Sequence, residues 1–157
     1  MEPELHMLKK TILIVDDEVS ALQTMKMVLS TQIQTVKTIS SAREALAFIQ
    51  ESKTPLSLLI TDIIMPSMGG AELIRGVQEV NSSLPILVIT GYGNAVLFEK
   101  LKKCGVDHFL AKPFTPDELL SAVLAMLRAD NKRKEAVVEP STSAAALTCN
   151  KEGSDIR

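Results

Sequence analysis

The chain has 157 residues, of which 46% are hydrophobic and 3% aromatic, and its formal net charge is −2. A chain of this length and composition can bury one proper hydrophobic core, as a folded globular domain does. The charge is close to balanced and no basic stripe runs along the chain, so we expect no direct nucleic-acid binding.

Targeting and membrane signals are not evident in the sequence. The first ten residues, MEPELHMLKK, lack the apolar run of a secretory signal peptide. The longest apolar stretches, such as Leu56–Ile60 and Pro85–Ile89, are too short to cross a bilayer. The two cysteines, Cys104 and Cys149, match no metal-ligand spacing. We therefore expect a cytoplasmic protein without membrane contact.

Short apolar runs, typical of β-strands, alternate along the chain with longer segments of helical periodicity. The predicted strands are Thr11–Val15, Ile33–Ile39, Leu58–Asp62, Ile86–Thr90 and Asp107–Ala111. The first, third and fourth contain continuous apolar stretches, as expected for strands that are buried on both faces. The irregular mixture of apolar and polar residues in Ile33–Ile39 suits an edge strand.

The segments between and after these strands carry apolar residues at helical spacing. Their apolar stripes are Leu22, Met25 and Leu29; Ala42, Ala45, Leu46 and Ile49; Leu73, Ile74, Val77 and Val80; Leu97, Phe98, Leu101 and Cys104; and Leu119, Leu120, Val123, Leu124 and Leu127. Ser41 and Thr115 are each followed three residues later by glutamate, which predicts capping boxes at the starts of the second and fifth helices. Gly105 is typical of a helix end.

Strands that alternate with helices indicate repeated β–α–β units. The predicted fold is therefore α/β, a doubly wound, five-stranded parallel sheet with helices on both faces. We expect this domain to span residues 8–129. After Ala129 the chain becomes rich in Ser, Thr, Ala, Lys and Glu without an apolar stripe, so we expect residues 130–157 to be a disordered tail or linker.

Polar residues follow or end four of the predicted strands. Asp16 and Asp17 follow the first strand, Asp62 ends the third, Thr90 ends the fourth, and Lys112 follows the fifth. Ligands of open parallel sheets bind beyond the carboxyl ends of the strands. We therefore expect three acids, one hydroxyl and one lysine to meet at one edge of the sheet.

Each of these residues has a simpler interpretation when it is taken alone. Acids after a strand often cap the next helix, Thr90 could be an ordinary strand residue, and Lys112 could extend from a strand end into solvent. Complementary groups at four strand ends are difficult to explain in that way. Glu18 is the exception, since we expect it only to favour the helix start and assign it no ligand role.

Three carboxylates gathered at one point must take up protons or bind a cation. A site that offers only oxygen ligands and is open on one side suits Mg²⁺ (or Mn²⁺), which also accepts phosphate oxygens. Lys112 and the Thr90 hydroxyl could then hold the remaining phosphoryl oxygens. Asp62 lies on a central strand and is the candidate nucleophile, because a carboxylate can form an aspartyl phosphate.

The chain resembles the receiver domains of bacterial two-component response regulators (chemotaxis-response-regulator-like) across roughly residues 8–129. The matching residues are Asp16-Asp17, Asp62 with Met65-Pro66 and Gly69-Gly70, Thr90-Gly91, and Phe109 before Lys112-Pro113-Phe114. The resemblance implies a flavodoxin-like sheet with strand order 2-1-3-4-5. It also implies a phospho-accepting signalling switch rather than an enzyme, with at most self-dephosphorylation.

The resemblance assigns ligand roles on the acidic side of the site. Asp62 would be the phospho-acceptor and a metal ligand, Asp17 the direct metal ligand, and Asp16 would act mainly through water. Ile64 would lend its backbone carbonyl to the metal.

The remaining roles belong to the fourth and fifth strands. Thr90 would be the switch hydroxyl that moves toward the phosphoryl group, and Phe109 the aromatic residue that turns inward behind it. Lys112 would contact the phosphoryl group, and its bond to Pro113 would be cis.

The same resemblance implies partners. A sensor histidine kinase or a histidine phosphotransfer protein would phosphorylate Asp62. The face made by the fourth helix, fifth strand and fifth helix would then shift toward binding a downstream protein. We expect a monomer or a phosphorylation-dependent dimer.

Ile64 and Tyr92 depart from several well-known receivers, which carry polar or acidic groups two residues beyond the phospho-acceptor and the switch hydroxyl. Both positions flank the route of the water that would hydrolyse an aspartyl phosphate. We therefore expect apolar bulk there to slow self-dephosphorylation.

Other functions remain open at this stage. We expect a stand-alone receiver, and the alternative is a receiver fragment of a larger DNA-binding transcription regulator. A metal-dependent phosphohydrolase of the haloacid-dehalogenase type would need Asp-x-Asp after the first strand, where this chain has Asp16-Asp17. A flavodoxin-like FMN carrier would need a Ser/Thr/Gly phosphate loop at the same place, and no G-x-G-x-x-G motif follows a strand.

Overall fold

A computed structural model describes residues 8–65, 68–91, 95–106 and 108–136. Its strands form one parallel sheet in the order β2-β1-β3-β4-β5, which confirms the predicted doubly wound fold. The strands are β1 (Leu8–Val15), β2 (Ile33–Ile39), β3 (Leu58–Asp62), β4 (Ile86–Thr90) and β5 (His108–Ala111). The helices are α1 (Val19–Leu29), α2 (Ala42–Glu51), α3 (Gly70–Val80), α4 (Ala95–Lys103) and α5 (Pro116–Ala136).

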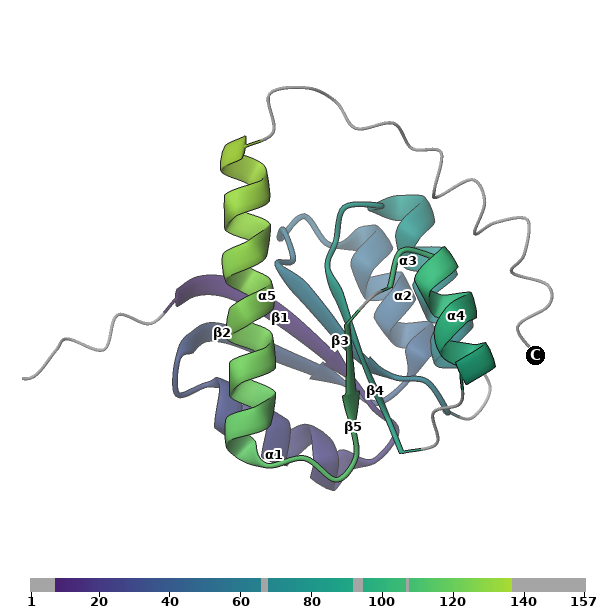
Figure 1. Ribbon diagram of the computed structural model, residues 1–157, viewed down its shortest axis with the longest axis horizontal. Helices are drawn as coiled ribbons and strands as arrows, with labels where there is room; N and C mark the ends of the chain where they lie inside the picture. Colours follow the sequence, from purple (N-terminus) through teal and green to yellow (C-terminus); the bar gives the residue numbers. More distant parts are fainter. Residues whose placement is uncertain (1–7, 66–67, 92–94, 107, 137–157) are drawn as a thin grey trace, which may run out of the picture.

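The helices form two layers, with α1 and α5 on one face of the sheet and α2, α3 and α4 on the other (Figure 1). The alternation of side chains along β1 explains this division. Ile12 and Ile14 pack with residues of α1 and α5, whereas Leu13 and Val15 pack with residues of α2 and α3. All four side chains are fully buried. The central strands therefore contribute to two cores, one on each side of the sheet.

The predicted capping signals are present in the structure. At the start of α5, Glu118 N–H donates to the Thr115 hydroxyl and Thr115 N–H donates to the Glu118 carboxylate. Both donor–acceptor distances are 3.1 Å. At the start of α2, the Ser41 hydroxyl accepts from Glu44 N–H at 3.3 Å. Gly105 follows α4 with a φ of +88°, a conformation that glycine adopts without strain. Short-range signals therefore determine where these helices begin and end.

Two elements are longer than predicted. Strand β1 begins at Leu8, where two lysines precede the apolar run, and it pairs there with Ile33 of β2. Helix α5 continues past Ala129 to Ala136. In this extension the Asn131 side chain accepts a 2.7 Å hydrogen bond from Lys10 Nζ, which ties the helix to β1. The polar composition after Ala129 conceals this contact. Most of the predicted tail, residues 137–157, and Asp107 lie outside the described residues.

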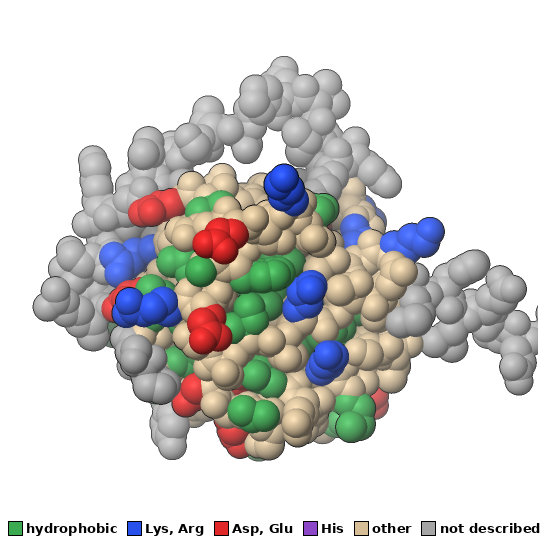
Figure 2. All heavy atoms as spheres, turned by 180° about the vertical axis from the view of Figure 1, so that it is seen from behind, with side chains coloured by type: hydrophobic (Ala, Val, Ile, Leu, Met, Phe, Trp, Pro, Cys, Tyr) green, Lys and Arg blue, Asp and Glu red, His purple; other side chains and the backbone are tan. Residues whose placement is uncertain are grey.

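Surface charge is mixed on the face shown in Figure 2, where basic and acidic side chains of the described residues are interspersed without a basic stripe. None of the helices in the described part of the chain has the length and apolar character needed to span a membrane.

Candidate functional site

The three predicted acids meet at the carboxyl edge of the sheet. Val15, the last residue of β1, pairs with Thr61 of β3, so Asp16 follows β1 directly beside Asp62, the last residue of β3. One oxygen from each of Asp16, Asp17 and Asp62 lies within 4.8 Å of the others. Asp16 is 1% exposed, Asp62 is half-buried and Asp17 is exposed. The cluster thus has a buried floor and an open side.

Lys112 reaches this cluster from the end of β5. Its Nζ lies 2.9 Å from Asp62 Oδ2 and 3.3 Å from Asp16 Oδ2. Its backbone N–H donates to the Thr90 carbonyl at 3.0 Å, and the Lys112–Pro113 peptide bond is cis, as the resemblance implies. The lysine therefore bridges the two carboxylates that end the two neighbouring strands.

Backbone amides hold the other oxygen of each of these carboxylates. Asp16 Oδ1 accepts from Glu18 N–H at 2.9 Å, and Asp62 Oδ1 accepts from Ile64 N–H at 3.1 Å. Each side chain is therefore bound at both oxygens, which fixes its orientation before any ligand is present.

Burial and charge act in opposite directions on the titrating groups. Burial raises the pKa of the Asp16 carboxyl above its ordinary value, and the Glu18 N–H and the Lys112 charge only partly offset this effect. Burial alone would lower the pKa of Lys112, but hydrogen bonds and charge interactions with Asp62 and Asp16 outweigh it and raise that pKa. The lysine is therefore firmly protonated at neutral pH.

Thr90 and Phe109 lie on the two strands beyond Asp62. Asp62 pairs with Ile89, so Thr90 follows directly beside it at the end of β4, where it is 3% exposed. Phe109 pairs with Val88 and is half-buried, and its ring packs against Phe98 of α4 with centroids 4.8 Å apart. The threonine is thus at the edge of the site, and the phenylalanine links β5 to α4.

Comparison with known proteins agrees with this geometry. The response regulator receiver domain family matches residues 12–124. The chain belongs to this family. As a family, receiver domains are phosphorylation-dependent signalling switches that take phosphoryl groups from histidine kinases and bind Mg²⁺ at an acidic pocket. The match argues against the phosphohydrolase alternative.

Individual relatives give the extent of the similarity. Nodulation protein W of Bradyrhizobium diazoefficiens is 32% identical over 128 residues, which cover 82% of this chain and 56% of that protein. Transcriptional regulatory protein FixJ of Rhizobium meliloti is 33% identical over 113 residues, or 72% of this chain and 54% of that protein. The receiver thus spans about half the length of these curated relatives.

A solved structure matches over nearly its whole length. The CheY-like response regulator receiver domain protein of Methanospirillum hungatei has a TM-score of 0.75 and 29% identity, and the match covers 80% of this chain and 98% of that one.

Two other residues on the rim of the receiver site were singled out from the sequence. Ile64 is 60% exposed directly after the acidic cluster. Glu18 precedes the first residue of α1 and accepts a 3.0 Å hydrogen bond from the Ser20 hydroxyl. This placement fits the expected helix-start role. Pro66 and Tyr92 lie outside the described residues.

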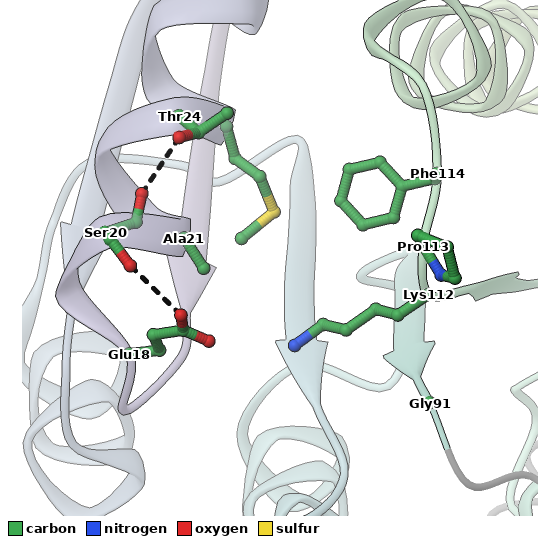
Figure 3. Close-up of a pocket in the computed structure, with 9 residues that line it drawn as sticks. Glu18, Ser20, Ala21, Thr24, Gly91, Lys112, Pro113 and Phe114 are labelled. Carbon is green, nitrogen blue, oxygen red and sulfur yellow. Dashed lines mark hydrogen bonds between the residues drawn. The ribbon is translucent and has the colours of Figure 1, made fainter.

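A groove of about 660 Å³ beside Lys112 was not predicted from the sequence. Its walls come from α1 and from the segment after β5, and Figure 3 shows the Phe114 ring facing α1 across it. The small residues Ser20, Ala21 and Thr24 line the α1 side. In the sequence, the signal for such a groove would be small residues on one helix and an aromatic residue elsewhere in the chain. Only the tertiary structure shows that these residues face each other.

Proposed function

We propose that this receiver is a phosphorelay response regulator in which Asp62 accepts a phosphoryl group in a Mg²⁺-dependent reaction. The observation that supports this best is the bridge from Lys112 Nζ to Asp62 and Asp16, with all three carboxylates inside 4.8 Å of one another. A fixed cation beside a half-buried carboxylate is suited to an anionic reactant that the acids alone would repel.

The residues present fit a magnesium ion. Asp16, Asp17 and Asp62 supply hard oxygen ligands, one side of the cluster is open, and the Ile64 carbonyl follows on the same loop. When bound, Mg²⁺ would neutralise charge on the acids and on the phosphoryl oxygens. Within the described part of the chain, Lys112 is paired with two of these three acids, and the remaining negative charge is one that a divalent cation balances.

The protein's own groups divide the reaction between them. An Asp62 oxygen forms a bond to phosphorus as the bond from phosphorus to the donor's histidine nitrogen breaks. If the other ring nitrogen of that histidine carries a proton, the imidazole leaves as a neutral group. This chain then does not have to supply a proton to the leaving group. Lys112, which pairs with Asp62 Oδ2 before the reaction, would then hold a phosphoryl oxygen.

The proposed switch passes through Thr90 and Phe109. The Thr90 hydroxyl would bond a phosphoryl oxygen, and Phe109 would follow inward. Because the Phe109 ring packs on Phe98, this movement would reach α4 directly. The output surface would be the face of α4, β5 and α5, which would bind a downstream protein or a second copy in the phosphorylated state.

Domain boundaries and context belong to the same proposal. We assign the receiver unit to residues 8–129, with α5 continuing it to Ala136 and the rest as tail or linker. We also propose that the protein is cytoplasmic and that its phosphoryl donor is a sensor histidine kinase or a histidine phosphotransfer protein. Its output is either that of a stand-alone receiver or that of a larger transcription regulator. The second is favoured by FixJ, a relative that is named a transcriptional regulatory protein.

Labelling with radioactive acetyl phosphate in the presence of Mg²⁺ tests the proposal. The wild type and Asp117→Asn, which alters an exposed acid in the first turn of α5, should both become labelled. Asp62→Asn should not. Equal labelling of Asp62→Asn would refute the assignment, whereas turnover of a phosphate ester would favour a hydrolase. Capture of partners with Mg²⁺ and beryllofluoride, a phosphoryl mimic, then identifies the output.

A further inference from the structure

Gly70, the first residue of α3, lies against the backbone of the segment that carries Asp62. A Cβ atom at Gly70 would lie 2.3 Å from the Asp62 carbonyl oxygen and 2.7 Å from the Ile63 Cα. Both neighbouring atoms are backbone atoms, so neither can move away by rotating a side chain. Restoring an ordinary contact would require the backbone to move by about 1 Å, a misplacement that can matter greatly at a reactive site.

The backbone beneath Gly70 is held on both sides. Asp62 is paired to Ile89 in the sheet, and the Ile63 side chain is 7% exposed within the core beneath α3. Gly70 N–H donates to the Ile63 carbonyl at 3.0 Å, which joins the start of α3 to the same segment. A side chain at residue 70 would therefore press on backbone that has little freedom to yield.

This backbone also carries the reactive groups. Asp62 Oδ1 accepts from Ile64 N–H at 3.1 Å, so the carboxylate and the residue two positions later move as a unit. A shift of Asp62 and Ile63 would change the distance from Asp62 to Asp16 and Asp17, and it would turn the Ile64 carbonyl. The Lys112 ammonium group would then no longer lie within hydrogen-bond distance of both Asp16 and Asp62.

We propose that Gly70 is a positioning residue for the phosphoryl-accepting site: because it lacks a side chain, α3 can begin directly on the Asp62–Ile63 backbone and hold the Asp62 carboxylate and the Ile64 carbonyl in register with Asp16 and Asp17. This inference rests on the proposed function, because it assumes that these groups bind Mg²⁺ and accept a phosphoryl group.

Two neighbouring glycines provide matched controls. Among the described residues, a Cβ at Gly69 would meet the Ile63 carbonyl oxygen at 3.7 Å, which is an ordinary contact. A Cβ at Gly76 would lie 2.7 and 2.8 Å from the methyl groups of Leu46 on α2, away from the acidic cluster. Gly69→Ala therefore tests the same loop without a clash, and Gly76→Ala tests a clash in the same helix without contact to the site.

The experiment compares the full-length wild type with Gly70→Ala, Gly69→Ala and Gly76→Ala. Mg²⁺ affinity is measured by calorimetry well below the unfolding temperature, and thermal unfolding is followed by circular dichroism. We expect Gly70→Ala to bind Mg²⁺ about tenfold or more weakly, as is usual when support around a metal ligand is lost. Gly69→Ala should match the wild type. Gly76→Ala should leave Mg²⁺ affinity unchanged whatever happens to its unfolding midpoint, because the Leu46 side chain can rotate away from the new methyl group and lies away from the acidic cluster. A purely structural role of Gly70 predicts the same for Gly70→Ala, a changed midpoint with unchanged Mg²⁺ affinity.

Each other result counts against the proposal. Wild-type Mg²⁺ affinity in Gly70→Ala would overturn it, and so would a Gly70→Ala chain without cooperative unfolding, because the glycine would then serve folding rather than the site. If the wild type itself bound no Mg²⁺ and accepted no label from acetyl phosphate, the proposed function would fail first. If the Gly70 proposal alone failed, the wild type and both controls would bind Mg²⁺ and become labelled, and Gly70→Ala would bind Mg²⁺ as tightly as they do or would fail to fold.

Discussion

The Lys112 ammonium group lies 2.9 Å from a carboxylate oxygen of Asp62, although the two residues are 50 positions apart in the chain. The same nitrogen contacts Asp16, which is almost fully buried. One lysine is thus paired with two acids. A third acid, Asp17, has a carboxylate oxygen within 4.8 Å of an oxygen of each of them. The electrostatic imbalance at this point determines how the protein should respond to charge removal, to pH and to Mg²⁺.

Replacing Asp16 with asparagine should stabilise the Mg²⁺-free protein at neutral pH. Burial raises the pKa of the Asp16 carboxyl, so the folded state holds its proton more tightly than the unfolded chain does. The stability from this group is therefore fully present below its ordinary pKa of 3.8 and is lost as the pH rises through the raised pKa of the folded state. At neutral pH the buried charge is a cost, and we expect Asp16→Asn to recover about 1–3 kcal/mol.

Urea unfolding in EDTA from pH 3 to pH 8 measures this effect. The difference between Asp16→Asn and the wild type should be large at neutral pH and should shrink toward zero as the solution is acidified. Asp117→Asn, at an exposed position, should show no comparable gain. Lower stability of Asp16→Asn at neutral pH would mean that the ion pair with Lys112 outweighs the cost of burial.

Mg²⁺ should stabilise the wild type, and Asp17 should be required for that effect. Asp17 is exposed, so Asp17→Asn should leave the stability measured in EDTA nearly unchanged. At a Mg²⁺ concentration about a hundred times the dissociation constant, binding should add about 2.7 kcal/mol to the free energy of unfolding of the wild type. Unfolding midpoints with and without Mg²⁺ give the comparison. An equal Mg²⁺-dependent gain in Asp17→Asn would remove this residue from the ligand set.

The convergence of Asp16, Asp62 and Lys112 could be predicted from the sequence because parallel strands end at a common edge. Each apolar run ends at a polar residue, and the β–α–β pattern requires these ends to meet. The capping signals at Ser41 and Thr115 are local as well, and they were equally readable. Such features depend on neighbours in sequence or on the topology alone.

Features that depend on tertiary contact were not readable. The sequence of α5 after Ala129 is polar, but in the structure Asp130 is buried and Asn131 accepts a hydrogen bond from Lys10, so the helix still packs against the domain there. The groove beside Lys112 depends on Phe114 facing α1, and the importance of Gly70 depends on how closely α3 approaches β3. No short sequence motif specifies the distance between Phe114 and α1 or the distance between α3 and β3.

Thr90→Val should separate phosphorylation from its readout. The Thr90 side chain is buried at the end of β4, and valine preserves its shape while removing the hydroxyl. Labelling of Asp62 by acetyl phosphate should persist, but the coupling between the site and the α4–β5–α5 face, typically about 1–3 kcal/mol in switches of this kind, should be lost. NMR shifts of the Phe98 and Phe109 rings on addition of Mg²⁺ and beryllofluoride report this coupling. If the rings of Thr90→Val shifted by as much as those of the wild type, the hydroxyl would not be part of the switch.

Ile64 should lengthen the lifetime of the phosphorylated state. Its side chain is 60% exposed beside the acidic cluster, where it can shield the acyl phosphate from an attacking water without occupying a ligand position. Asparagine at this position would replace the apolar barrier with a group able to hold that water, so we expect Ile64→Asn to lose label several-fold faster than the wild type.

Decay of labelled protein in Mg²⁺ after removal of acetyl phosphate measures the lifetime. Val80→Asn is the matched control, because Val80 is also an exposed apolar residue, 47% accessible, but lies at the far end of α3. It should decay at the wild-type rate. If the wild type lost its label as fast as Ile64→Asn or faster, Ile64 would not protect the phosphoryl group, and the lifetime would be set by other residues around Asp62.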